Sequence, residues 1–193
     1  MKGAVTLSVA ILLTGLWAGG ALAHDDTAGA LGQVHFPTSC AAPAQPVFER
    51  GVALLHSFWY EEALKTFTSV TTTDPACAMG YWGMAMSVYY PLWQPPSEAM
   101  LTKGRAALDK AATLRATPRE KDYVAALATF YRDSDKLDHR TRAVAYEKAM
   151  EQLAARYPSD REASRSDSRA GAAGERQPPG RTRRVEPGGT RRE

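Results

Sequence analysis

A recurring pattern of small residues, packing residues and prolines constrains the fold of this chain more than any other feature. A small residue is followed four positions later by a second packing residue and then, roughly eight residues on, by a proline. The three copies are Ala63, Phe67 and Pro75; Ala107, Ala111 and Pro118; and Ala145, Ala149 and Pro158. Residues four apart share one face of a helix, and proline cannot continue a helix. Each copy therefore predicts the second helix of a hairpin, and the chain as a whole predicts an all-α stack of helix pairs.

Apolar stripes between the prolines support this interpretation. Phe48, Val52 and Leu55 fall on one face of a helix expected at about residues 46–58. Further helices are expected at about 60–71, from 76 onwards, 97–114, from 118 onwards and 138–157. Ser97 is a favourable N-cap, and Pro118 suits the first turn of a helix. Stacked helix pairs of this kind more often bind other molecules than transform them.

In the first pair, Gly51, Tyr60, Ala63, Phe67 and Pro75 resemble the tetratricopeptide repeat pattern. The resemblance implies a right-handed solenoid of about three helix pairs over residues 46–163. The small residues of this set would let helices approach closely, the aromatic residues would fill the groove between them, and the proline would turn the chain. It also implies a scaffold that binds protein or peptide on its concave face, without catalytic residues or cofactors.

A narrower resemblance covers the segments 36–40, 48–63 and 74–83. These segments look like the opening of exported bacterial tetratricopeptide repeat proteins of unassigned function. This similarity again implies an interaction protein, and it places the chain outside the cytoplasm.

The first 23 residues read as a secretory signal peptide. Lys2 precedes an apolar run, and the run ends in the small residues of Ala21-Leu22-Ala23, so cleavage is expected after Ala23. Residues 24–45 then form an irregular arm, in which Leu31, Val34 and Phe36 can pack in an extended conformation. No later segment is long and apolar enough to cross a membrane. In a Gram-negative bacterium the protein would therefore be periplasmic.

The chain has two cysteines, Cys40 and Cys77. An oxidising compartment allows them to pair, and no CxxC or CxxCH motif indicates a redox or haem site. A structural disulfide is favoured, and a reactive or metal-binding thiol pair is the alternative. A bridge would stabilise the chain by about 3–4 kcal/mol in the loop-entropy description.

The last thirty residues, 164–193, interrupt the helical pattern. They hold eight arginines and four acidic residues, which account for the positive net charge of +3 on a chain that is otherwise near neutral. Such a segment cannot bury enough surface to fold, so it is expected to be disordered. It is either a native basic tail or an out-of-frame translation, and the frameshift is favoured because the break falls inside an expected helix. Because the chain is exported and the tail lacks interleaved aromatic residues, nucleic acid is not an expected partner.

An aromatic segment with three prolines is the best candidate for a partner-binding surface. Tyr81, Trp82, Tyr89 and Trp93 are the expected contact residues for an unknown protein or peptide. The alternative is that these side chains are folded onto the hydrophobic core.

A second hypothesis is a periplasmic enzyme that binds a metal or cofactor. It would use His56, His24 or His35, with His56 as a donor or general base beside Trp59 and Tyr60. An aromatic turn without chemistry explains the same residues more simply. No phosphate-binding loop, nucleophile elbow or zinc-protease motif occurs, so neither catalytic residues nor a metal are assigned. A truncated fragment without function is the third possibility.

Overall fold

The computed structural model describes residues 31–89 and 94–164. All regular elements in these two ranges are helices, which confirms the all-helical fold predicted from the sequence. The proposed signal peptide, the first part of the arm, Trp93 and the tail after residue 164 lie outside the described residues. The helices are α1 (Gln45–His56), α2 (Tyr60–Thr73), α3 (Ala78–Ser87), α4 (Glu98–Ala112), α5 (Pro118–Tyr131) and α6 (His139–Arg156), and a helical turn follows at 161–164.

Local capping explains where several helices begin. Ser97 caps α4 by accepting a hydrogen bond from the backbone N–H of Met100. Thr117 and Glu120 form a capping box at α5, and Pro118 occupies the first turn. These side chains satisfy backbone donors that a helix otherwise leaves open, so the chain enters each helix at a defined residue.

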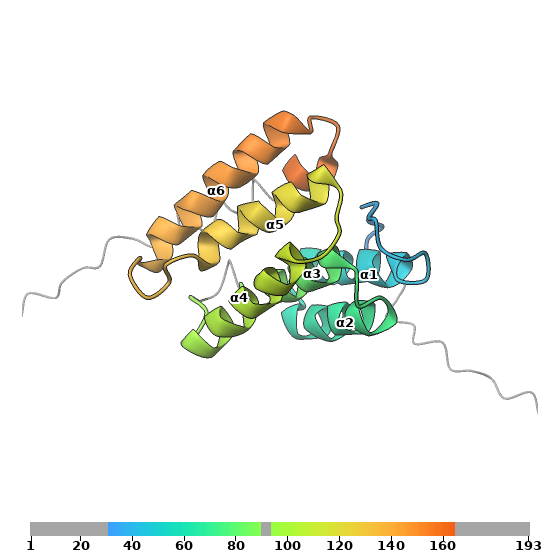
Figure 1. Cartoon of the computed structure of the whole chain (residues 1–193), viewed down its shortest axis with the longest axis horizontal. Coiled ribbons are helices and arrows are strands. Elements are labelled where there is room, and N and C mark those ends of the chain that lie inside the picture. Colours follow the sequence, from blue (N-terminus) through green and yellow to red (C-terminus); the bar gives the residue numbers. More distant parts are fainter. Residues whose placement is uncertain (1–30, 90–93, 165–193) are drawn as a thin grey trace, which may run out of the picture. The chain divides into compact units, whose positions relative to one another are not determined.

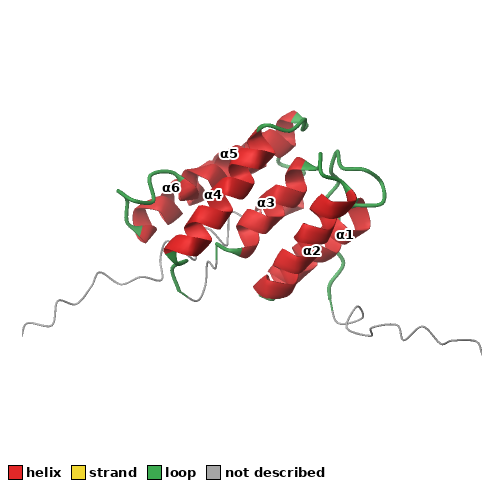
Figure 2. Ribbon diagram, turned by 60° about the horizontal axis from the view of Figure 1, so that its bottom comes forward, coloured by secondary structure: helices red, strands yellow, loops and turns green. Residues whose placement is uncertain are grey.

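Consecutive helices pack against one another along the chain, from α1 to α6 (Figure 1). In addition, α3 contacts both α1 and α5. The ribbon in Figure 2 shows α3 lying between these neighbours. The surface formed by α1, α3 and α5 therefore runs across all three pairs, and it carries the candidate site. Among the described residues, no helix combines the length and apolar character needed to cross a membrane.

Close approach of the helices depends on glycines around Phe67. The Phe67 ring is fully buried in α2, between Gly51 of α1 and Gly83 of α3. A methyl group at Gly51 would lie 2.7 Å from the ring, and one at Gly83 would overlap it. Both positions must therefore stay without a side chain for α2 to pack against its two neighbours.

Four of the five residues that carry the repeat pattern are buried between α1, α2 and α3. They are Gly51, Tyr60, Ala63 and Phe67. Pro75 is exposed in the connection between α2 and α3, where it follows the last helical residue, Thr73. Its place in the turn fits a residue that stops the helix.

Candidate functional site

Three buried aromatic side chains, one from each helix of the α1, α3 and α5 surface, form what we call the aromatic socket. They are Phe48 of α1, Trp82 of α3 and Tyr123 of α5. The Trp82 and Tyr123 rings meet edge to face with centroids 5.7 Å apart, and Phe48 lies 6.4 Å from Trp82. The socket thus links the three helix pairs through a single aromatic cluster.

The N-terminal arm fills this socket with Phe36. Its ring lies 5.3 Å from Phe48, 5.8 Å from Trp82 and 5.0 Å from Tyr123, measured between centroids, and only 1% of the residue is exposed. The Arg119 guanidinium covers the same ring at 4.5 Å. Phe36 is therefore an anchor that gains both apolar burial and a cation–π contact.

Side chains of α1 bind the backbone of the arm. The Phe36 N–H donates to Glu49 Oε1 at 3.0 Å, and the Phe36 carbonyl accepts from Gln45 Nε2 at 2.9 Å. The Thr38 N–H donates to Gln45 Oε1 at 3.1 Å. Because these bonds involve main-chain groups, they would hold almost any residue in an extended conformation.

A carboxylate on α5 holds the next residue of the arm. Glu120 accepts hydrogen bonds from the Ser39 N–H at 2.6 Å and the Ser39 hydroxyl at 2.7 Å, and from the Thr117 N–H at 2.7 Å. Burial by itself would raise the pKa of Glu120, but these bonds outweigh it and hold the pKa below its usual value of 4.5. The ionised form is therefore the one that holds the arm.

Acid should loosen this attachment. Because the folded pKa of Glu120 is lowered, its contribution to stability is complete above about pH 4.5 and is lost as the pH falls through the folded pKa. Replacing Glu120 by glutamine should cost about 2 kcal/mol near neutral pH and flatten the acid limb of the stability curve. Urea unfolding between pH 3 and 7 measures both effects, with Glu151→Gln as the control at an exposed carboxylate. If the stability of the Glu120→Gln variant fell with acid as steeply as that of the unchanged protein, the role of ionised Glu120 in holding the arm would be contradicted.

Cys40 and Cys77 form a disulfide, as the sequence predicts. The bridge attaches the arm to the start of α3, and beside it Asp74 accepts a hydrogen bond from the Ala41 N–H at 2.7 Å. Cys40, Asp74 and Cys77 are the cluster of metal-ligating residue types in the described ranges, but both sulfurs are used in the bridge.

Arg119 joins the arm to the segment after α6. Its Nε donates to Asp160 Oδ2 at 2.6 Å and its Nη1 donates to the Pro37 carbonyl at 3.0 Å. The Tyr123 hydroxyl also donates to Asp160, at 2.9 Å. Burial would raise the pKa of Asp160, yet the bonds from Arg119 and Tyr123 lower it below its usual value. Arg119 and Asp160 therefore link the arm, the socket residue Tyr123 and the segment after α6.

No protein-family model, curated protein or solved structure matches this chain.

The structure separates the four residues expected to contact a partner. Trp82 belongs to the aromatic socket, whereas Tyr89 is buried against Phe130 and Tyr146, with centroids 4.4 and 5.4 Å away. Tyr81 is half-buried, with its hydroxyl 3.4 Å from the Pro75 carbonyl. Trp93 lies outside the described residues. Tyr89 and Trp82 are thus both buried in this structure, and their part in partner binding stays a prediction.

The chain's own arm packs on the α1, α3 and α5 surface, and partner binding on a concave face stays a prediction. Sequence analysis identified Phe36 as a packing residue of the arm but missed Arg119 and Glu120. Both residues look like ordinary first-turn charges in the sequence. Their role is visible only in their contacts with the arm: Glu120 binds Ser39, which lies 81 residues earlier in the chain, and Arg119 binds the Pro37 carbonyl.

The two candidate histidines that the structure describes, His56 and His35, lie beside different carboxylates. His56 Nε2 lies 2.8 Å from Glu162 Oε2, whereas the His35 side chain is exposed and lies 3.8 Å from Glu49. His24 lies outside the described residues. The structure thus supplies the carboxylate partner for His56 that the sequence could not reveal, but it gives His35 a different one.

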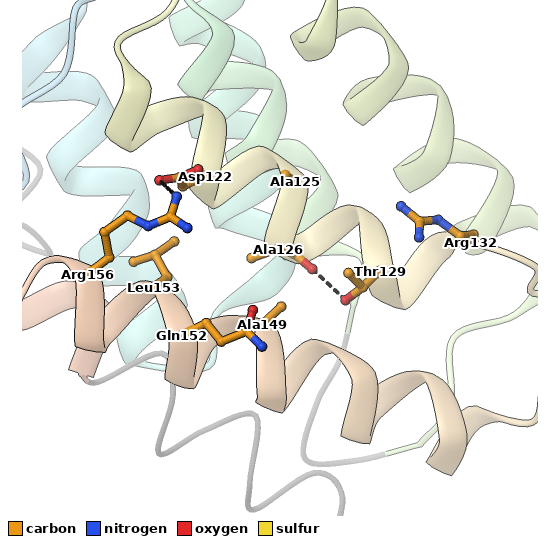
Figure 3. Close-up of a pocket in the computed structure, with 9 residues that line it drawn as sticks. All are labelled: Asp122, Ala125, Ala126, Thr129, Arg132, Ala149, Gln152, Leu153 and Arg156. Atoms are coloured by element: carbon orange, nitrogen blue, oxygen red, sulfur yellow. Dashed lines mark hydrogen bonds and ion pairs between the residues drawn. The ribbon is translucent and has the colours of Figure 1, made fainter.

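A separate hollow lies between α5 and α6 (Figure 3). An ion pair between Arg156 and Asp122, at 2.8 Å, closes one end, and Arg132 lies towards the other. Short side chains form much of the wall: Ala125, Ala126, Thr129 and Ala149. Its lining includes one carboxylate, Asp122, which is paired with Arg156, and one hydroxyl, Thr129, which donates to the Ala126 carbonyl.

Proposed function

We propose that this protein is an exported scaffold of the tetratricopeptide repeat type that binds an extended segment of a partner protein. Consecutive packing of the helices, together with the contacts of α3 to α1 and α5, is the arrangement expected of stacked pairs in a right-handed solenoid. The proposed binding surface is the one formed by α1, α3 and α5, and it includes Trp82 from the set identified in the sequence.

One observation carries this proposal: the surface already holds the arm, a segment without helix or strand, in the manner of a bound peptide. The arm inserts one aromatic anchor, Phe36, into the socket, while Glu49, Gln45 and Glu120 bind its backbone. Extended peptides are commonly bound through main-chain hydrogen bonds combined with a pocket for a side chain. The socket and these three side chains would bind a partner segment that offers an aromatic side chain and the matching main-chain groups.

A buried polar atom in the socket supports a ligand as well. The Trp82 indole N–H is buried and has no hydrogen-bond partner in the part of the chain that the structure describes. An unpaired buried donor costs free energy, and a ligand carbonyl would satisfy it. The arm, which occupies the socket in this structure, leaves this donor without a hydrogen-bond partner.

Export is part of the proposal. The signal-like segment at residues 1–23 and the disulfide between Cys40 and Cys77 are compatible with secretion to an oxidising compartment such as the periplasm.

Binding in trans tests the proposed function. A variant that lacks residues 34–39 but keeps Cys40 should bind a synthetic peptide that copies residues 33–39, because its socket is empty. The same peptide with Phe36→Ala should bind about thirtyfold more weakly, the loss expected for removing a central aromatic anchor. Isothermal titration calorimetry gives both affinities.

Trp59→Ala, placed in the deletion variant, is the matched control. It removes an exposed aromatic side chain of the turn between α1 and α2 and should leave peptide binding unchanged. A deletion variant that keeps its helical circular dichroism but binds neither peptide would refute the proposed function.

A further inference from the structure

The covalent link to the arm lies directly beside the groups that hold it. Cys40 follows Ser39, which Glu120 binds, and it is four residues from the anchor Phe36. The noncovalent ties between the arm and the helices are hydrogen bonds, a cation–π contact and ring packing, and each of these can exchange with water or with another ligand. Apart from the backbone that continues through residues 41–44 into α1, the disulfide is therefore the one covalent tie of the described part of the arm to the helices.

The bridge also determines how far the arm can move. With the bridge intact, residue 40 is fixed to the start of α3 while residue 45 begins α1. Without it, the covalent tether of the arm to the helices runs through residues 41–44 into α1, so the tether that holds Phe36 is longer. An internal occupant on a longer tether competes less well with an external segment than one tethered close to its site.

The surroundings of the two sulfurs favour attack by a reductant on Cys40, with Cys77 as the leaving group. Cys40 is half-buried, whereas Cys77 is buried, so a thiolate reaches the Cys40 sulfur more easily. Attack there breaks the S–S bond, and its electron pair leaves on Cys77 Sγ. That sulfur accepts a hydrogen bond from the Gly80 N–H at 3.2 Å at the N-terminus of α3, which stabilises a thiolate. The nearby Asp74 carboxylate opposes the approach of anionic reductants.

We propose that the Cys40–Cys77 disulfide is a latch that keeps the arm in the aromatic socket, and that reduction by a dithiol opens the socket to an extended segment with an aromatic anchor. The inference rests on the proposed function. The reaction balances without further reagents: the second thiol of the dithiol attacks the mixed disulfide on Cys40, so the protein gains two thiols and the reductant becomes a cyclic disulfide.

The test uses the full chain and a fluorescent form of the peptide that copies residues 33–39. Fluorescence anisotropy measures its affinity in the absence and presence of dithiothreitol. We expect reduction to strengthen binding at least tenfold. The variant Cys40→Ser should bind equally well with and without dithiothreitol, and a peptide with Phe36→Ala should remain weak throughout.

The outcomes separate this inference from the proposed function. If the variant lacking residues 34–39 binds the peptide but the full chain binds it equally in both redox states, the latch is refuted and the proposed function stands. If circular dichroism shows that reduction unfolds the helices, the latch is also refuted, because the bridge then holds the fold rather than the arm. If the deletion variant does not bind, both inferences fail.

Discussion

Replacing Gly83 by alanine should lower the free energy of unfolding by about 3 kcal/mol, the largest effect we expect from adding a single methyl group. The new Cβ would overlap the Phe67 ring, which is fully buried and also lies against Gly51 of α1. Overpacking of this kind usually costs about 1–3 kcal/mol, and the overlap with a ring puts this substitution at the upper end. The higher helix propensity of alanine returns at most about 1 kcal/mol. Urea unfolding monitored by circular dichroism measures the change.

Two further variants make the test specific. Gly32→Ala adds the same methyl group where no other atom lies within 4 Å, so its stability should stay within about 0.5 kcal/mol of the unchanged protein. Phe67→Leu should cost less in the Gly83→Ala background than alone, because the smaller side chain relieves the overlap. If the effects of the two substitutions were additive, the predicted overlap between residue 83 and the Phe67 ring would be contradicted.

Replacing Phe36 by alanine should destabilise the protein by about 3–4 kcal/mol. The substitution empties the aromatic socket, removes ring contacts with Phe48, Trp82 and Tyr123, and takes away the ring that Arg119 covers. Losses of this size are typical when a buried phenylalanine is truncated. Thermal and urea unfolding of the oxidised full chain give the value.

Phe36→Leu tests whether aromatic character matters. It restores most of the volume but not the edge-to-face or cation–π contacts, so it should recover more than half of the lost stability. Truncation of Leu137, an exposed side chain between α5 and α6, should change stability by less than about 0.5 kcal/mol. An equally small effect at Phe36 would show that the arm does not contribute to the fold.

The local signals in the sequence predicted most helix boundaries well. α2 ends at Thr73, just before Asp74-Pro75, and α5 begins at Pro118 after the capping residue Thr117. Such signals act within about four residues, and proline geometry and side-chain capping do not depend on distant parts of the chain. Boundaries of this kind can therefore be predicted from the sequence alone.

The surroundings of the predicted contact residues could not be read from the sequence, because burial depends on the whole fold. Tyr89 and Trp82 look alike in sequence, yet Tyr89 packs against Phe130 and Tyr146, whereas Trp82 lies in the socket. An aromatic residue in a helix is equally suited to a core and to a ligand pocket. The difference arises from which helices lie beside it.

The sequence by itself determined the helical class, the ends of several helices and a cysteine pair able to bridge, because periodicity, capping and proline act over short distances. Only the tertiary structure decided that the arm fills the surface of α1, α3 and α5. Its contacts join Ser39 to Glu120 across 81 residues, just as His56 meets Glu162 across 106. Pairings at such separations depend on how the helices stack, and a single sequence carries no local signal for them.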